Sequence, residues 1–270
     1  MNVEAYLERI DYRGGLEPSW ETLRGLHRAH LFAIPYENLD IHLGSPLLLD
    51  EEAIFKKLVL KKRGGWCYEM NALFAWALRQ VGFEVTLLAG AVNRDKLGFE
   101  ADSSHLVLLV ELDKQYLVDV GFGNGFLEPL QLREGTQRQH YLTYHLERLN
   151  GAWWRYRQDH AGPNYDFTLA SHKLAAFADK CHYLQTSPDS GFVRVTVCQR
   201  FFPDRVLSLR GAVLETLDSG GSHERVIESF AEYKRLLTKD FDLLLPNLEP
   251  LWERVWQSHL EWQAFLKGQA

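Results

Sequence analysis

The sequence predicts an α+β protein in which helices come first, β-strands follow, and a mixed region ends the chain. Apolar residues recur at helical spacing up to about residue 82, and short β-rich runs come next. A dense turn signal, QTSPDSG, then precedes further strands and helices. A chain of 270 residues can bury a sizeable core. We therefore expect three parts, at residues 1–83, 84–188 and 189–270.

The composition and charge exclude several classes of protein. Hydrophobic residues make up 46% of the chain and charged residues 24%, as in an ordinary globular protein. A net charge of -6 and a pI near 6.0 argue against nucleic-acid binding, which needs a basic surface. The apolar runs are too short to span a membrane, and the N-terminus lacks the apolar core of a secretory signal. We expect a cytoplasmic monomer or homodimer that binds neither nucleic acid nor membranes.

The cysteines indicate thiol chemistry rather than a disulfide framework or a zinc site. Cys67, Cys181 and Cys198 are an odd number without CxxC spacing. His27 and His30 share one helix face, but no third ligand lies nearby in the sequence. We therefore expect no metal site and two core histidines.

Turn and cap signals divide the helical region before residue 82. Leucines and histidines fall on one face between residues 20 and 34. Asp50 is typical of an N-cap, and Gly64 with Gly65 ends the helix that it starts. Helical spacing resumes after the glycines and stops at Gly82. Cys67 should therefore lie in, or just before, the first turn of a helix.

Two polar residues stand out in the strands that follow. His105 begins the run HLVLLVEL, and Asp119 interrupts YLVDVGFG, where an unpaired buried carboxylate would be costly. If Glu111 pairs with Gln115 across a three-residue loop, His105 and Asp119 share one face of the hairpin. A two-residue loop would place them on opposite faces unless a bulge intervened. We predict the first register or a bulge.

A cysteine nucleophile needs help to ionise, because a free thiol has a pKa of about 8.5. A helix N-terminus or a nearby imidazolium can stabilise the thiolate. Cys67 has the first by position, with Arg63 close by, and His105 held by Asp119 would supply the second. On the residues alone, a Cys67–His105–Asp119 triad and an inert buried thiol with two structural polar residues both stay open.

Other motifs fit structural roles. GFGNGF, residues 121–126, follows a strand but precedes no helix, so we interpret it as a glycine-rich turn rather than a phosphate loop. In KCHY, Cys181 and His182 would point to opposite faces of an extended segment and form no dyad. We expect SGGS, residues 219–222, to lead into a helix, and a last helix with packed aromatic residues to open near Pro250.

Several segments resemble the arylamine N-acetyltransferases: RGGWCYEMN, FAIPYENLDIHLG, HLVLLVEL and YLVDVGFGNGFLEPL. SPDSGFVRVTVCQRF is similar to the start of the last domain of that family. The resemblance spans most of the chain. It implies an N-terminal helical bundle, a central β-barrel and a C-terminal α/β lid, with a cysteine-protease-like Cys-His-Asp triad.

The resemblance also implies a reaction. Cys67 matches the nucleophile of the family, His105 its base and Asp119 its orienting acid. An acetyl group would pass from acetyl-CoA, a co-substrate rather than a bound cofactor, through Cys67 to an arylamine or arylhydrazine in ping-pong fashion. The alternatives are a thiol hydrolase or transglutaminase-like amidase with the same triad, and a non-catalytic thiol or ligand-binding module.

Binding and supporting residues follow from the same resemblance. They comprise Phe122 and Gly123 in the acyl and acceptor pocket, Ser104 at a CoA-contacting position, and Tyr36 and Tyr68 in place of family phenylalanines. Both tyrosines would affect the choice of acceptor.

The segment through Gly64 and Gly65 that leads to Cys67, the cysteine loop, should also be held in place by an ion pair. The resemblance implies that Arg63 pairs with Glu37 beneath this loop. Asn38 is a candidate third member beside this pair.

Overall fold

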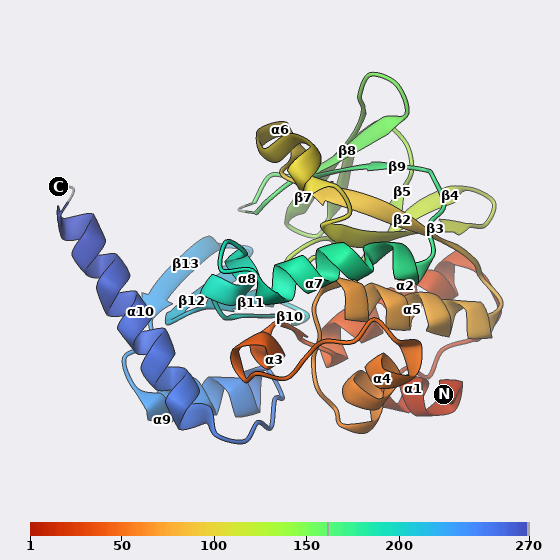
Figure 1. Ribbon diagram of the computed structural model, residues 1–270. Coiled ribbons are helices and arrows are strands. Elements are labelled where there is room, and N and C mark those ends of the chain that lie inside the picture. The colour runs from red at the N-terminus through yellow and green to blue at the C-terminus, as the bar shows by residue number, and fades with distance from the viewer. Residues whose placement is uncertain (161, 269–270) are drawn as a thin grey trace.

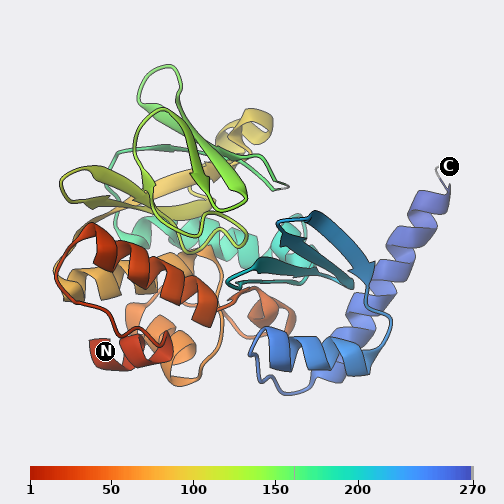
Figure 2. The same ribbon diagram turned by 180° about the vertical axis from the view of Figure 1, so that it is seen from behind.

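The computed structural model describes residues 1–160 and 162–268. Figure 1 shows the N-terminal helices on one side of α7 (Ala178–Thr186) and a strand-rich part on its other side. The third part lies beside them, and α10 (Leu248–Gly268) extends outward from it in both views (Figures 1 and 2). Within the described part of the chain, no helix is long and apolar enough to cross a membrane.

Side-chain caps and glycines set the ends of the N-terminal helices. The side chain of Asp50 accepts a hydrogen bond from the Ala53 N–H, as predicted for an N-cap. Gly82, with φ of 103°, ends α5 in the left-handed conformation that favours glycine. The elements are α1 (Val3–Arg9), α2 (Trp20–Ala33), β1 (Tyr36–Glu37), α3 (Leu39–His42), α4 (Glu51–Phe55) with its continuation η1 (Lys56–Leu60), and α5 (Cys67–Val81).

The central part is a nearly closed barrel of eight strands in the order β5-β4-β3-β2-β9-β8-β7-β6. The two end strands are joined by glutamine side chains: Gln137 bonds both to the N–H and to the carbonyl of Gln131, and Gln139 does the same with Glu128. The elements are β2 (Glu84–Val92), α6 (Arg94–Leu97), η2 (Gly98–Ala101), β3 (His105–Glu111), β4 (Gln115–Val118), β5 (Leu130–Gln131), β6 (Gly135–Gln139), β7 (Leu142–Arg148), β8 (Trp153–Gln158) and β9 (Tyr165–Thr168).

The hairpin register agrees with the prediction. Glu111 pairs with Gln115 across a three-residue loop, and Leu108 pairs with Val118 at the far end of the ladder. The ladder ends at Val118, one residue before Asp119. Because side chains alternate between the two faces of a sheet, this register puts Asp119 and His105 on the same face.

The third part contains a five-stranded sheet in the order β1-β10-β11-β12-β13. Its first strand comes from the N-terminal part, because Tyr36 pairs with Gln199 of β10. Two elements come between the barrel strands and this sheet in the sequence: η3 (Leu174–Phe177) and α7 (Ala178–Thr186). The elements after them are α8 (Gly191–Arg194), β10 (Val197–Phe201), β11 (Arg205–Arg210), β12 (Val213–Asp218), β13 (Gly221–Val226), α9 (Phe230–Arg235), η4 (Leu236–Asp240) and α10 (Leu248–Gly268).

Three expectations for this region were wrong. SGGS leads into strand β13, because residues 221–226 pair with β12 before the helix begins. KCHY lies in helix α7 rather than in an extended segment, although Cys181 is buried and His182 exposed, so the two still form no dyad. Of the C-terminal aromatic residues, Trp262 and Phe265 are 56% and 60% exposed, because α10 extends beyond the residues that bury its first turns.

Two apolar clusters form the interior. The larger joins the N-terminal helices to the barrel, and the smaller joins the third part to Leu39 of α3. The division into parts at residues 83 and 188 stays a prediction.

Candidate active site

Cys67 is the first residue of α5 and is only 3% exposed. The loop after β4 approaches it closely: a Cβ added to Gly121 would lie 2.8 Å from the Cα and carbonyl oxygen of Cys67. A glycine is therefore needed at position 121 for the loop to reach the start of α5. The helix start lies where the sequence predicted it, next to the loop that carries Asp119.

His105 and Asp119 form a buried pair. The His105 Nε2 lies 2.7 Å from the Asp119 Oδ2, and each residue is 2% exposed. The other oxygen of Asp119, Oδ1, accepts hydrogen bonds from the Gly121 N–H at 2.9 Å and from the Asn71 Nδ2 at 2.8 Å. The carboxylate is therefore saturated with donors, as a buried charge requires.

The environment of the Cys67 thiol differs from the expectation that the helix start would lower its pKa. Burial raises this pKa well above its ordinary value, and Cys181 and Asp119 add to the increase. The backbone N–H groups of Leu106 and Tyr68 act in the opposite direction. Loss of hydration outweighs these two N–H groups, because so little of the thiol is exposed. A thiolate here needs a proton-accepting partner.

A hydrogen bond places the first turns of α5 beside the start of β3. The Nδ2 of Asn71, four residues after Cys67 in α5, donates to the carbonyl of Leu106, the residue after His105. The structure thus brings the three residues of the predicted triad into one buried region. Their action as a catalytic unit stays a prediction.

Phe122 and Gly123 lie in the loop after Asp119, and their role as pocket residues stays a prediction. The Phe122 ring centroid is 5.1 Å from that of His105 and 4.9 Å from that of Tyr165. Gly123 has φ of 74°, and a Cβ there would collide with the side chain of Gln199 from β10. Gln199, which the sequence analysis missed, therefore connects the third part of the molecule to this loop.

The remaining predicted binding residues have structural partners of their own. The Ser104 Oγ accepts a hydrogen bond from the Val92 N–H at 3.0 Å, which ties β2 to the start of β3. The Tyr68 hydroxyl donates to the Ser103 carbonyl at 2.7 Å, and Tyr68 is fully buried. Tyr36 lies in β1 and is 9% exposed. Their roles in binding CoA or an acceptor stay proposals.

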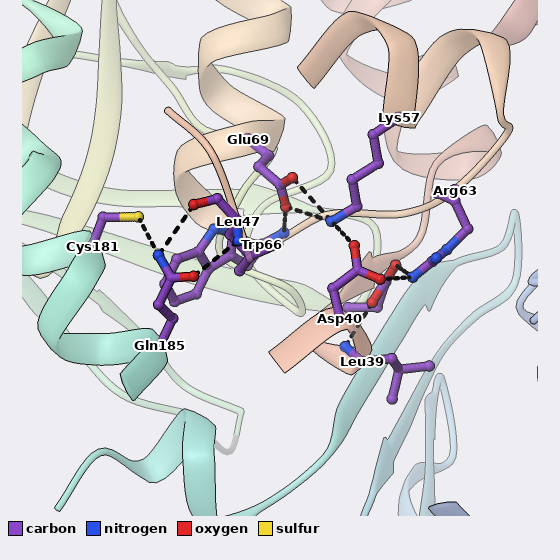
Figure 3. A network of polar contacts seen from close by, with 10 residues as sticks. Leu39, Asp40, Leu47, Lys57, Arg63, Trp66, Glu69, Cys181 and Gln185 are labelled. Atoms are coloured by element: carbon purple, nitrogen blue, oxygen red, sulfur yellow. Dashed lines mark hydrogen bonds and ion pairs between the residues drawn. The ribbon is translucent and has the colours of Figure 1, made fainter. Parts of the chain in front are cut away.

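A network of charged side chains lies under the cysteine loop (Figure 3). The Arg63 Nη2 contacts the Glu37 Oε1 at 2.9 Å, which is the expected ion pair, and also the Asp40 Oδ1 at 2.7 Å. Lys57 bridges Asp40 at 2.9 Å and Glu69 at 2.8 Å. Glu69 in turn accepts a hydrogen bond from the Trp66 N–H, at 3.3 Å, directly before Cys67. The network thus extends from Arg63 to Trp66, the residue directly before α5 begins.

Burial sets the electrostatics of this network. Burial alone would lower the pKa of Lys57, but the carboxylates around it, Glu69 first, raise it. Burial raises the pKa of Glu69, although Lys57 opposes this effect. Lys57 and Arg63 lower the pKa of Asp40 in spite of burial. Each ionised group therefore depends on its partners.

Asn38 is not the third member of this network, contrary to expectation. Its Nδ2 donates to the carbonyls of Phe192 and Val195, and its Oδ1 accepts from the Val197 N–H. Asn38 therefore ties β1 to the chain that enters β10. The amide prefers these backbone groups because they would otherwise lack partners at the strand end.

The members missed in the sequence are Asp40, Lys57 and Glu69. Glu69 stands three residues after Trp66, which is the spacing of a capping-box glutamate, so this signal was present. Nothing in the sequence pairs Asp40 with Lys57, because their contact depends on how α3 lies against η1.

We expect Arg63→Ala to lower the free energy of unfolding by about 3 kcal/mol, because it leaves a buried carboxylate without its cation. The Glu37 side chain is 0% exposed in the ion pair. Urea denaturation measures the change. Arg13→Ala is the matched control, because the Arg13–Asp11 pair is exposed and should contribute less than about 0.5 kcal/mol. Equal effects of both substitutions would contradict a role for burial in this network.

His27 and His30 are core residues, as predicted. Both are 0% exposed, and burial lowers the pKa of His27 to about 4. The His27 Nδ1 lies 2.9 Å from the Leu127 carbonyl, and the His30 Nδ1 lies 2.9 Å from the Tyr6 hydroxyl. No group of three potential metal ligands occurs among residues 1–160 and 162–268.

Known proteins are similar to this chain along most of its length. A model of a family described as N-acetyltransferase matches residues 19–249. Human arylamine N-acetyltransferase 1 is 34% identical over 273 residues, which covers 92% of this chain and 93% of the human protein.

Solved structures give the same result. An arylamine N-acetyltransferase of Mycobacterium smegmatis superposes with a TM-score of 0.86 at 33% identity, covering 94% of this chain and 97% of the other. The Mycobacterium marinum arylamine N-acetyltransferase in complex with CoA has a TM-score of 0.82 at 32% identity, covering 89% and 92%.

Proposed function

Since this chain belongs to the arylamine N-acetyltransferase family and is an acetyltransferase, we propose that it moves an acetyl group from acetyl-CoA to the nitrogen of an arylamine or arylhydrazine through an acetyl-cysteine at Cys67. Its co-substrate is acetyl-CoA, the thioester of the CoA found in the related Mycobacterium marinum complex. No permanently bound cofactor takes part in this scheme.

The observation that carries the proposal is the buried hydrogen bond between His105 and Asp119 beside the start of α5. The pair uses the Nε2 of His105. In the proposed scheme, Nδ1 is therefore the ring nitrogen available to accept the proton of the Cys67 thiol. A nucleophile, a base and an orienting acid in this order are the parts of a cysteine-dependent acyl transfer. The same parts would serve a thiol hydrolase, and membership of the family supports the transferase reaction over the hydrolase.

In the first half-reaction His105 takes the proton of the Cys67 thiol. The resulting thiolate attacks the carbonyl carbon of acetyl-CoA, a new C–S bond forms, and the C–S bond to CoA breaks. The CoA sulfur leaves with the proton returned by the imidazolium. Because burial disfavours a lone thiolate at this position, the thiolate and imidazolium form together as a pair.

In the second half-reaction the amine nitrogen attacks the acetyl carbon. The C–N bond forms, the C–S bond to Cys67 breaks, and His105 accepts the proton that the nitrogen loses. The backbone N–H of Cys67 is our candidate donor to the oxyanion of each tetrahedral intermediate. Phe122 and Gly123 would line the space for the acetyl group and the acceptor.

The charged network under the loop has a supporting role in this scheme. Arg63 and Glu37 hold the chain before Cys67 against β1, and Glu69 fixes the Trp66 N–H. A nucleophile must be held close to its attack geometry, because small displacements lower the rate strongly. The network would therefore keep Cys67 in place through both half-reactions.

Intact-mass measurement tests the function directly. The protein is incubated with acetyl-CoA, its mass is recorded, and an arylamine such as aniline is then added. We expect a gain of one acetyl group, located on Cys67 by peptide mapping, and its loss when the amine is present. An unmodified protein with a reactive Cys67 and amidase activity would contradict the transferase and favour the hydrolase.

A further inference from the structure

Asn71 links the cysteine helix to both of the other predicted triad residues. It is 0% exposed and lies four residues after Cys67, so the two side chains share one face of α5. Its Nδ2 donates to the Asp119 Oδ1 at 2.8 Å and to the Leu106 carbonyl at 2.6 Å. Its Oδ1 accepts from the Val120 N–H at 3.0 Å. One side chain therefore touches α5, the start of β3 and the loop after β4.

We propose that Asn71 is a positioning residue that sets the distance and orientation of the His105–Asp119 pair relative to Cys67. This inference rests on the proposed function, because it concerns the same reaction. Asn71 acts through Asp119 and is not itself a catalytic residue.

The hydrogen bonds of Asp119 give the physical reason. Its Oδ1 accepts from Asn71 and from the Gly121 N–H, so Oδ2 is the oxygen left for the His105 Nε2. With Oδ1 fixed, the carboxylate cannot rotate away from the ring. The ring then presents Nδ1 on its other side, as a base toward the thiol requires.

Asn71 also fixes the position of α5 relative to the segments that carry His105 and Asp119. The bonds to Leu106 and Val120 hold the residue after His105 and the residue after Asp119 to the same amide. Gly121 completes the contact, because a Cβ there would lie 2.7 Å from the Asn71 Nδ2. Without this amide, the barrel and α5 would keep their apolar contact but lose the polar bonds that set their relative position.

Asn71→Asp gives the sharpest test, because it keeps the shape and the Oδ1 acceptor but replaces the donor to Asp119 with an oxygen. The two carboxyl groups can approach only while they share a proton. We expect the acetylation rate of this variant to be highest at acidic pH and to fall as the pH rises, in contrast to the parent protein. Asn71→Ala should lower the acetylation rate about 100-fold at every pH.

Asn38 is a matched control. It is 1% exposed and its amide also makes three hydrogen bonds, but all of them go to backbone groups away from His105 and Asp119. Asn38→Asp and Asn38→Ala should lower stability without changing the shape of the pH profile. Thermal unfolding of all four variants measures their stability. If one substitution at a position prevents folding, the other substitution at the same position is used in the comparison.

A second measurement separates this inference from the proposed function. The rate at which iodoacetamide alkylates Cys67 is followed against pH by peptide mass spectrometry, with no acetyl-CoA present. We expect Cys67 of the parent protein to be alkylated at pH values well below the ordinary thiol pKa, because the imidazolium of His105 would offset the effect of burial. Asn71→Ala should lose that reactivity. Parent protein that shows this profile but gains no acetyl group would refute the function and leave the role of Asn71 standing. Identical pH profiles for the Asn71 and Asn38 variants in both measurements would overturn the proposed role of Asn71.

Discussion

Replacing Cys67 with serine is expected to abolish acetyl transfer, with a loss of about four orders of magnitude or more in turnover. A hydroxyl is much harder to ionise than a thiol, and the buried site already disfavours the anion. The measurement is acetylation of an arylamine at saturating acetyl-CoA, together with the intact mass of the protein. Neither an acetyl adduct nor turnover should be detected.

The two other cysteines provide matched controls for this substitution. Cys181 and Cys198 are 2% and 1% exposed and lie in α7 and β10. Cys181→Ala and Cys198→Ala should each retain one acetyl group per chain and near-parental turnover. Appreciable activity in Cys67→Ser, or loss of the adduct in a control, would refute Cys67 as the nucleophile.

Asp119→Asn should lower turnover by about four orders of magnitude, by analogy with the same substitution in a serine protease triad. The surroundings force the orientation of the new amide. Asn71 and the Gly121 N–H both donate to Oδ1, so the amide oxygen must stay there and the NH₂ group must face the His105 Nε2. The ring would then carry its proton on Nδ1 and could not accept one from the thiol. Steady-state turnover and the pH profile measure the effect.

Asp166 gives the matched control for this prediction. It is also 0% exposed, and it pairs with Arg155 at 2.6 Å rather than with a histidine. Asp166→Asn should lower the free energy of unfolding while keeping turnover near that of the parent. If Asp119→Asn kept near-normal rates in a folded protein, Asp119 would leave the proposed catalytic set.

The barrel hairpin marks how far local patterns reach. The requirement that His105 and Asp119 share one face predicted either the pairing of Glu111 with Gln115 or a bulge, and the structure contains that pairing. Glycine and cap signals likewise predicted where α5 begins and ends. These features follow from neighbours in the sequence, because register and caps depend on a few adjacent residues.

The predictions that failed concern residues whose partners lie far away in the sequence. Residues 221–226 become β13 because β12 offers an edge to pair with, and the turn signal before them could not reveal that edge. Asn38 forms hydrogen bonds with backbone groups between residues 192 and 197, and Asp40 rather than Asn38 contacts Arg63. The pKa of Cys67 rises because the barrel removes water from a helix start that would otherwise favour the thiolate.

The sequence by itself determined the order of most helices and strands and the helix start at Cys67, because each depends on local spacing. It left more than one hairpin register open for His105 and Asp119, and the structure selects the one with a three-residue loop. Only the tertiary structure decided what holds these residues together. The contacts of Asn71 and Gly121 exist only after α5 packs against the barrel. The charged network of Lys57 and Arg63 exists only after α3, η1 and α5 pack together. Directional hydrogen bonds between buried groups need all partners in place, and no local pattern encodes that arrangement.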